Sequence, residues 1–280
     1  MHSLLLRTYA KINLGLQVLE KRSDNFHKIE TIFHRINLFD EIKFQFADSG
    51  VFFSSSSSEI DNENNLCVKA VKLFQGKLKF NFGIKINLEK KIPIGAGLGG
   101  GSSDAASILI GLCKFFDIEL SNSTLNEIAI QLGSDVSYFL KNGSAYATNR
   151  GENLEYFELK IPYWIVVVYP NIHISTLWAY QNIIPNNLKR KNLKLLVQNF
   201  SYGKEKIKND FEKTIFEKFP EIQKIKNSFY EFGAMFSLMS GSGSSVFGFF
   251  EDELSAKKFF EYNKNQYKTF LTEPNFYPYD

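Results

Sequence analysis

Residues 93–106 read PIGAGLGGGSSDAA, and residues 107–116 continue as SILIGLCKFF. The stretch opens with five glycines within seven positions: Gly95, Gly97, Gly99, Gly100 and Gly101. Glycine lets consecutive N–H groups point into one concavity, and the dipole of a following helix attracts anions at its N-terminus. Because Ser102, Ser103 and Asp104 suit the start of a helix, the stretch predicts a phosphate-binding loop that runs into a helix.

The same glycines permit other interpretations. Gly95, Gly97 and Gly100 satisfy the G-x-G-x-x-G expression of dinucleotide-binding enzymes, and Asp117 follows Gly97 by 20 residues. That pattern would indicate an NAD-dependent oxidoreductase, but only inside a βαβ unit, whereas the preceding residues resemble antiparallel strands. A Walker A loop is excluded because no Lys follows the glycines, and a flexible linker does not suit the immediate continuation into a helix.

The residues before this loop predict mostly strands. Residues 3–47 are rich in β-branched and aromatic side chains, which indicates several strands separated by turns at KRSDN and NLFD. The serine run and Asn/Asp cluster of residues 51–65 predict a surface loop. Residues 65–75 then have helical spacing, and residues 82–93 resemble a strand that Pro93 ends.

Short elements follow the loop. We expect helical segments over 124–133, with Thr124 and Glu127 as a capping box, and over 134–143, then a strand and turn over 143–150. From residue 163 the expected elements are a strand (163–169), helices (176–183, 193–199, 210–232), two strands (234–240, 244–250), a helix (253–263) and a strand (268–273). With the helical stretch taken as one unit, this is the β-α-β-β-α-β order of ferredoxin-like domains, which predicts two domains, 1–160 and 161–280.

Composition excludes several classes of protein. The 280 residues are 44% hydrophobic and 22% charged, so a packed core is expected, and the formal net charge of +3 indicates neither nucleic acid nor anionic membrane as a partner. Cys67 and Cys113 lie in apolar surroundings typical of reduced thiols. With no apolar run of about 18 residues and only three leucines before Arg7, neither a membrane span nor a signal peptide is expected, and we expect a cytoplasmic protein.

Several segments together resemble the GHMP kinase superfamily. They are Ala10–Leu14, Arg22–His27, Thr31–Phe33, Pro93–Ala106, Ser134–Val136, Arg150–Glu152, Asn209–Glu212 and Met239–Gly243. GLGGGSSDAA and the His27 segment favour the branch that acts on 4-diphosphocytidyl-2-C-methyl-D-erythritol over relatives that phosphorylate another alcohol, such as homoserine or mevalonate. That other alcohol remains one alternative, and a dinucleotide-binding oxidoreductase remains another.

The resemblance implies an α+β, two-domain GHMP kinase fold, with an N-terminal ribosomal-protein-S5-domain-2-like domain and a C-terminal ferredoxin-like domain. It implies a site in the cleft between them, where the γ-phosphate of ATP passes to the 2-hydroxyl of the substrate in the non-mevalonate route to isoprenoids. ATP is expected as the phosphate donor and Mg²⁺ as its counter-ion, for which Ser103 is the candidate ligand. The phosphate-binding residues implied are Pro93, Gly95, Gly97, Leu98, Gly99, Gly100, Gly101, Ser102 and Ser103.

The resemblance also implies the catalytic pair. Asp135 is implied as the group that accepts the proton of the attacking hydroxyl, and Lys11 as the cation that keeps it ionised. Without the resemblance, Asp135 would be interpreted as a helix N-cap and Lys11 as a strand lysine facing water. Asn13 lies on the same strand face as Lys11 by the two-residue period, so its amide is a candidate to bind the substrate.

Two further groups of residues are implied in binding. Phe26 and His27 match positions that hold cytosine, with Tyr180 as a second aromatic face. Thr176, Gly241 and Ser242 are further candidates on the substrate side, although Gly241 and Gly243 by themselves favour a hairpin turn. The candidates for the adenine side are Asn65, Leu66 and Lys90.

Four residues depart from the family pattern. Asn25 and Phe26 stand where Gly and Tyr are usual, Ser137 where Pro is usual, and Asn149 where Gly is usual. Asn best replaces Gly at positive φ, and Phe keeps a stacking face while it loses the hydroxyl. We therefore expect the stacking to persist without any contact through that hydroxyl.

Overall fold

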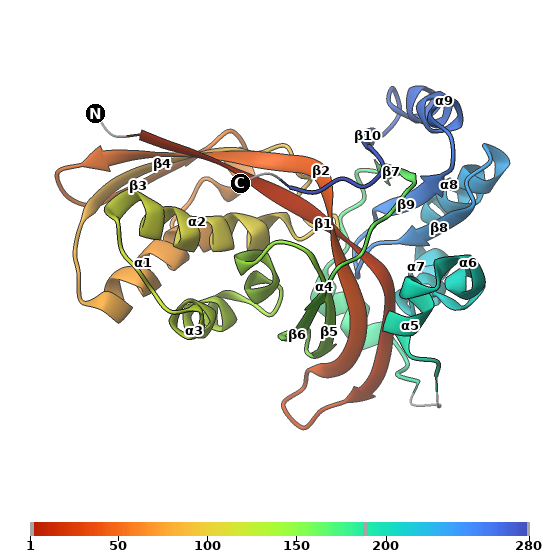
Figure 1. Cartoon of the computed structure of the whole chain (residues 1–280), viewed down its shortest axis with the longest axis horizontal. Helices are drawn as coiled ribbons and strands as arrows, with labels where there is room; N and C mark the ends of the chain where they lie inside the picture. The colour runs from red at the N-terminus through yellow and green to blue at the C-terminus, as the bar shows by residue number, and fades with distance from the viewer. Residues whose placement is uncertain (1–2, 187–189, 279–280) are drawn as a thin grey trace.

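The computed structural model describes residues 3–186 and 190–278, which form two β-sheets with helices packed against each (Figure 1). The N-terminal sheet has the order β3-β4-β2-β5-β6, with β1 paired to β2. Its strands are β1 (Ser3–Lys21), β2 (His27–Ala47), β3 (Val51–Ser55), β4 (Gly83–Glu89), β5 (Ser144–Asn149) and β6 (Asn153–Phe157). All pairs are antiparallel except β3 with β4.

The first two strands are longer than predicted. The turn at KRSDN is present, where the Arg22 N–H donates to the Phe26 carbonyl (2.8 Å), but the break predicted at NLFD is wrong. Asp40 in that segment is fully buried and accepts hydrogen bonds from the N–H groups of Lys91 and Ile92, so a turn-forming residue is kept inside a continuous strand. Register shifts along β1 let one strand follow the curved sheet.

Other local predictions are corrected as well. The loop predicted over 51–65 contains β3 and a 3₁₀ turn, η1 (Ser58–Ile60), because the first serines pair with β4. Strand β6 was not predicted. The helix predicted over 124–133 starts earlier, since Ser121 is the N-cap and accepts from the Thr124 N–H, so Thr124 and Glu127 form no capping box.

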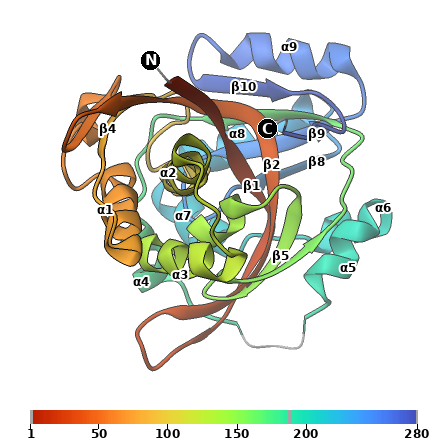
Figure 2. The ribbon, with the colours of Figure 1, turned by 60° about the vertical axis from the view of Figure 1, so that its left-hand side comes forward.

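Three helices cover one face of the N-terminal sheet: α1 (Leu66–Leu78), α2 (Gly100–Phe116) and α3 (Asn122–Leu132) (Figure 2). The apolar residues of α2 pack on the strands, and the approach is close at Gly111, where a Cβ would lie 2.4 Å from the ring of Phe44. A second 3₁₀ segment, η2 (Val136–Leu140), packs beside α2 and α3. This packing sets the direction in which the N-terminus of α2 points.

The C-terminal half is the predicted ferredoxin-like arrangement. Its elements are β7 (Trp164–Tyr169), α4 (Thr176–Asn182), α5 (Leu193–Gln198), α6 (Phe200–Gly203), η3 (Lys204–Lys206), α7 (Phe211–Lys218), α8 (Pro220–Glu231), β8 (Phe236–Met239), β9 (Val246–Phe250), α9 (Glu253–Asn263) and β10 (Lys268–Thr272). The sheet order β10-β7-β9-β8 places β9 between two strands antiparallel to it. The helix predicted over 210–232 is two helices, because Pro220 starts the second.

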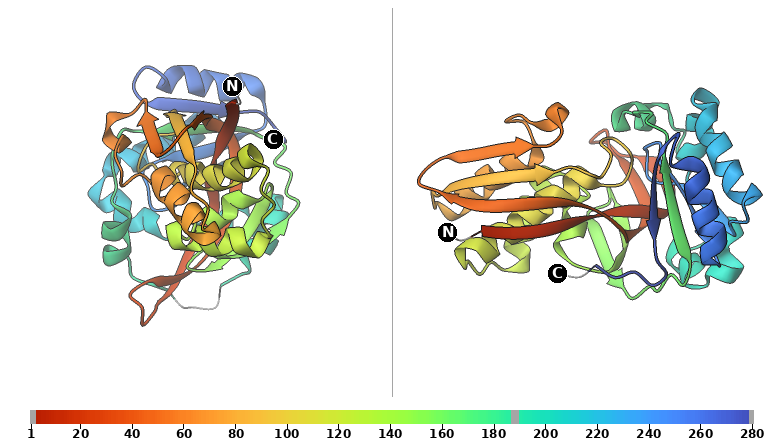
Figure 3. Two further views of the ribbon diagram at one scale, coloured as in Figure 1. Left: turned by 90° about the vertical axis from the view of Figure 1, so that its left-hand side faces the viewer. Right: turned by 90° about the horizontal axis from the view of Figure 1, so that it is seen from above.

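The two halves share buried surface. Apolar residues of β1, among them Ile12 and Leu14, join Ile165, Leu238 and Phe247 of the C-terminal sheet in one cluster, and the long first strands run from one half to the other (Figure 3). The two-domain α+β fold is thus confirmed, while the boundary at residues 160 and 161 stays a prediction. Within the described residues, every helix is too short or too polar to cross a membrane.

Candidate active site

The glycine loop lies against the turn between β8 and β9. Gly97 has φ +81°, and a Cβ on it would lie 2.2 Å from the carbonyl oxygen of Ser240. The Ser240 hydroxyl donates to the Gly97 carbonyl (3.0 Å), and a Cβ on Gly243 would meet the Gly97 nitrogen at 2.3 Å. Both positions therefore need glycine. The second glycine cluster is a turn between strands, and it also closes against the first loop.

A cavity of about 1010 Å³ opens beside this contact and is lined by both halves of the chain. The N-terminus of α2 contributes Gly100, Gly101 and Ser102, whose N–H groups belong to the first turn of a helix and so lack partners within it. The predicted phosphate-binding residues that line the cavity are Pro93, Gly95, Gly97, Leu98, Gly99, Gly100, Gly101 and Ser102.

Ser103 is the exception and corrects one prediction. Its hydroxyl donates to the Tyr9 carbonyl (2.8 Å) and is bonded to the Thr8 hydroxyl (2.6 Å), and the side chain is buried away from the cavity. It therefore ties α2 to β1 and does not present an oxygen to a metal ion. Over the residues described, no group of three or more His, Cys, Asp and Glu side chains is placed to hold a metal.

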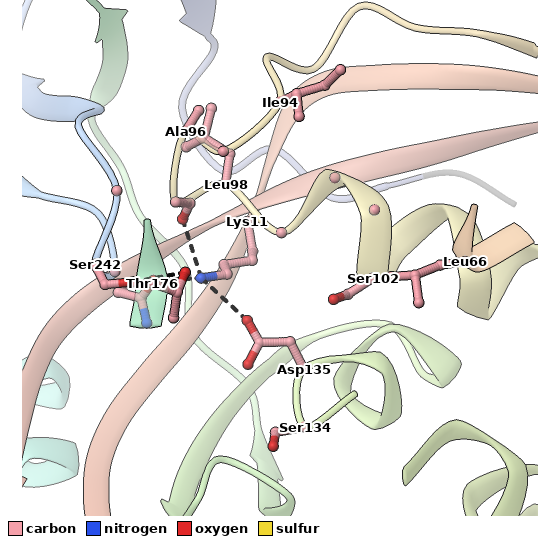
Figure 4. Close-up of a pocket in the computed structure, with 18 of the residues that line it drawn as sticks. Lys11, Leu66, Ile94, Ala96, Leu98, Ser102, Ser134, Asp135, Thr176 and Ser242 are labelled. Atoms are coloured by element: carbon pink, nitrogen blue, oxygen red, sulfur yellow. Dashed lines mark hydrogen bonds and ion pairs between the residues drawn. The ribbon is translucent and has the colours of Figure 1, made fainter. Parts of the chain in front are cut away.

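Lys11 is the central charged group of the cavity (Figure 4). Its ammonium donates to Asn13 Oδ1 (2.6 Å) and to the Gly97 carbonyl (3.2 Å), and it lies 3.6 Å from Asp135 Oδ2. The interpretation of Lys11 as a strand lysine facing water is wrong, because only 3% of the residue is exposed. Burial lowers the pKa of Lys11, and the charge and hydrogen bonding of Asp135 act against that shift.

Asp135 reaches the cavity from the segment just before η2. It occupies the N-cap position of η2, as the N-cap interpretation predicts, but its side chain makes no capping hydrogen bond, and about a third of that side chain is exposed to solvent. Asn13 lines the cavity, but its amide accepts from Lys11 and donates to the Thr31 hydroxyl (2.8 Å). Asn13 therefore orients Lys11.

The aromatic residues lie at one end of the cavity. Tyr180 stacks on His27, with ring centroids 5.2 Å apart, and not on Phe26. The Phe26 ring is half exposed, and the Arg150 guanidinium lies 4.7 Å from its centroid. Burial lowers the pKa of His27, with Lys21 as the second cause, so its imidazole is disposed to be neutral. Asn25 and Asn149 both have φ +66°, as their replacement of Gly predicts.

The remaining candidates also line the cavity. Ser242 donates to the Thr176 hydroxyl (3.4 Å), and Gly241 lies over Asn13. On the opposite side the Asn65 side chain caps α1 by accepting from the Cys67 N–H. Lys90 makes ion pairs with Asp40 and Asp104, so its ammonium is already occupied.

Among the charged residues that line the cavity, two had no predicted role. Arg150 was part of a matching segment, Arg150–Glu152, and its position over Phe26 could not be read from spacing. Asp104 was interpreted only as a helix-starting residue, yet it lines the cavity with one buried carboxylate oxygen that has no hydrogen-bond partner. Neither orientation has a local sequence signal, because each depends on segments distant in the chain.

The dinucleotide interpretation fails on topology. The glycine loop and α2 follow β4, and the next strand in the chain is β5. These two strands are not neighbours, because β2 lies between them and is antiparallel to both. The loop therefore does not belong to a βαβ unit with adjacent parallel strands. Asp117 is the C-cap of α2, at the opposite end of the helix from the glycine loop, and it does not line the cavity.

Comparison with known proteins shows the family of this chain. The model of the GHMP kinases N terminal domain matches residues 65–143, and that of the GHMP kinases C terminal domain matches residues 187–269. A 4-diphosphocytidyl-2-C-methyl-D-erythritol kinase of Pelodictyon phaeoclathratiforme is 42% identical over 99% of each chain. The chain belongs to the 4-diphosphocytidyl-2-C-methyl-D-erythritol kinase family of GHMP kinases.

Further relatives of this GHMP kinase support the same family and fold. A 4-diphosphocytidyl-2-C-methyl-D-erythritol kinase of Chlorobium chlorochromatii is 42% identical over 96% of each chain. A solved 4-(cytidine 5'-diphospho)-2C-methyl-D-erythritol kinase superposes with a TM-score of 0.84 at 31% identity, covering 96% of this chain and 98% of the other. A homoserine kinase of Cytophaga hutchinsonii shares the fold, with a TM-score of 0.73 at 18% identity over 97% and 95% of the two chains.

Proposed function

We propose that this GHMP kinase transfers the γ-phosphate of ATP to the 2-hydroxyl of 4-diphosphocytidyl-2-C-methyl-D-erythritol, a step of the non-mevalonate route to isoprenoid precursors. The observation that carries the proposal is the ion pair of Lys11 and Asp135 inside the cavity that the glycine loop borders. A small-molecule substrate fits a cavity of this volume, which both halves of the chain line.

Asp135 accepts the proton of the attacking 2-hydroxyl. Its partial exposure leaves a carboxylate oxygen accessible to a substrate, and the ammonium of Lys11 lies 3.6 Å from that carboxylate. Lys11 is held in place by Asn13 and the Gly97 carbonyl, so its charge is positioned before the substrate arrives. Phosphoryl transfer depends on such positioning and on electrostatic stabilisation of the developing charge.

The phosphates of ATP bind at the glycine loop and the N-terminus of α2. Gly97 and Gly99 have positive φ, and the first N–H groups of α2 border the cavity. These donors and the helix dipole neutralise part of the phosphate charge.

Magnesium is proposed to enter on the phosphates of ATP. The described residues contain no group of acidic and imidazole side chains placed to hold the ion, and the Ser103 hydroxyl is bonded elsewhere. We therefore expect phosphate oxygens and water to supply most of the magnesium ligands.

The aromatic end of the cavity selects the cytidylyl group. Phe26 offers a face for stacking, and the His27 imidazole offers a hydrogen bond to the base edge, while Tyr180 supports the His27 ring from behind. Thr176 and Ser242 lie on the same side of the cavity, within reach of the polyol. A cytoplasmic location remains a prediction from sequence.

The proposal is tested by incubating the purified protein with Mg-ATP and, separately, 4-diphosphocytidyl-2-C-methyl-D-erythritol, homoserine and mevalonate. ADP release and phosphorylated product are followed by mass spectrometry, with the Asp135→Asn variant as the blank. Turnover confined to the cytidylyl substrate is expected. Turnover with another alcohol would keep the kinase and reject this substrate, and no turnover with any of the three would reject the proposed reaction.

A further inference from the structure

Three ionisable side chains are buried together behind the glycine loop. Lys90 Nζ lies 2.5 Å from Asp40 Oδ2 and 2.7 Å from Asp104 Oδ2. None of the three side chains is more than 5% exposed. Asp40 comes from β2, Lys90 from the residue after β4, and Asp104 from the first turns of α2. We call this group the buried triad.

The two carboxylates of the buried triad are not equivalent. Asp40 Oδ1 accepts from the Lys91 N–H (2.5 Å) and the Ile92 N–H (2.7 Å), while its Oδ2 accepts from Lys90, so donors fill both oxygens. Asp104 Oδ2 accepts from Lys90, but its buried Oδ1 has no partner, and the residue lines the cavity. Asp104 is therefore the member that has room for a proton.

The charge of the buried triad opposes nucleotide binding. One ammonium and two carboxylates leave one net negative charge when all are ionised, in a region of low effective dielectric. This charge lies next to the N-terminus of α2, since a Cβ on Gly100 would be 2.9 Å from Lys90 Nζ. A triphosphate bound at the glycine loop would add further negative charge at the same place.

The surroundings of Asp104 bring its protonation equilibrium close to neutral pH. Burial raises the pKa of Asp104 to about 7; Asp40 acts in the same direction and Lys90 against it. The Cys67 thiol on α1 also interacts with it, but burial raises the pKa of that thiol well above its ordinary value, so it stays neutral. Where β1 packs on this end of α2, the Thr8 hydroxyl of β1 is bonded to the Ser103 hydroxyl of α2, and neither group carries a charge.

We propose that Asp104 takes up one proton from solvent when the phosphates of ATP bind, so that the buried triad both anchors the glycine loop and compensates the incoming charge. The proton binds to the free Oδ1, and no other bond changes. Asp40 anchors the loop through the N–H groups of Lys91 and Ile92, and Lys90 connects that anchor to α2. The inference rests on the proposed function only in taking ATP as the ligand.

The test is isothermal titration of Mg-AMP-PNP into the protein at about pH 7.5, in buffers of different ionisation enthalpy. The wild-type protein is expected to take up a fraction of one proton. Asp104→Asn keeps an acceptor for Lys90 but cannot titrate, so the uptake should be lost while the nucleotide still binds. The matched control is Glu41→Gln, which removes a surface carboxylate paired with Lys91 and should leave the uptake unchanged.

The affinity of the wild-type protein gives a second reading that needs no variant. The Kd for Mg-AMP-PNP should rise by up to about tenfold per pH unit as the pH passes above the pKa of Asp104. A flat Kd profile, binding without proton uptake, or unchanged uptake in Asp104→Asn would each overturn the inference and leave the kinase assignment standing. Failure of the wild-type protein to bind the nucleotide at all would instead reject the proposed function.

Discussion

Lys11 Nζ lies 3.6 Å from Asp135 Oδ2, although one residue belongs to β1 and the other to the segment that precedes η2. The distance is longer than a hydrogen bond, so the pair leaves room for a substrate hydroxyl to bond to the carboxylate. The ammonium is buried and tied to Asn13 and the glycine loop, whereas the carboxylate faces the cavity. The cation is thus the fixed partner and the carboxylate the accessible one.

Removing either member of this pair should abolish turnover. Asp135→Asn or Lys11→Ala is expected to lower kcat by about 10²–10⁴-fold, since a positioned proton acceptor contributes that much to catalysis. Binding of AMP-PNP, measured by titration calorimetry, should persist in Asp135→Asn. The control is Glu127→Gln on the surface of α3, which should turn over normally. A near-normal rate in both site variants would reject the assignment of acceptor and cation.

Because the pKa of Lys11 is lowered, we expect activity to be lost at a lower alkaline pH than the pH at which an exposed lysine titrates. The buried ammonium should lose its proton below the ordinary value of 10.5, and the site then loses the positive charge that stabilises negative charge developing during phosphoryl transfer. The kcat/KM profile should therefore fall on its alkaline side before an exposed lysine would titrate. Activity that stays level until the protein unfolds would contradict this prediction.

Close packing of the two glycine loops predicts that Gly97→Ala is damaging. The new Cβ would lie 2.2 Å from the Ser240 carbonyl, and Gly97 has φ +81°, which is strained for any other residue. We expect loss of both nucleotide affinity and melting temperature. Gly76→Ala is the control, since it lies in α1 with no atom within 4 Å of the added Cβ and should stabilise the protein by about 0.5–1 kcal/mol. Equal melting temperatures for the two variants would be inconsistent with the close contact.

Phe26→Ala should raise KM for the cytidylyl substrate more than it lowers kcat, because base stacking contributes equally to ground and transition states. The Arg150 guanidinium over the same ring would lose its partner, so Arg150→Ala should change KM in the same direction. Steady-state kinetics provide the measurement. Phe52→Ala, an equally exposed phenylalanine on β3 outside the cavity, is the control. An unchanged KM in Phe26→Ala would show that the cytosine binds elsewhere.

Lys90→Met should destabilise the protein by about 3–5 kcal/mol in denaturant unfolding, because it leaves two buried carboxylates without a cation. The folded state then binds protons more tightly than the unfolded state, so stability should be lost as the pH rises through neutrality. Lys91→Met, whose lysine pairs with Glu41 at the surface, is expected to cost less than about 1 kcal/mol. A similar loss of unfolding free energy in Lys90→Met and Lys91→Met would contradict this prediction.

Local rules predicted the elements whose patterns are complete within a short stretch. The glycine loop with α2, the buried strand β7 and the ferredoxin-like order of the C-terminal half followed from turn residues and hydrophobic periodicity. The same rules failed at Asp40, where a turn-like residue lies inside β2 because two N–H groups from beyond β4 satisfy its carboxylate.

The sequence by itself indicated the family and a glycine loop that runs into a helix, because these features are contiguous motifs with their own backbone requirements. Lys11 and Asp135 were implied as a pair only by the resemblance, since they belong to two motifs distant in the chain. Only the tertiary structure decided that Ser103 bonds to β1, that Tyr180 stacks on His27, and that Asp104 lies with Lys90 and Asp40. The direction of a side chain depends on partners from distant segments. Those partners meet only after the strands and helices have packed, so no local pattern contains them.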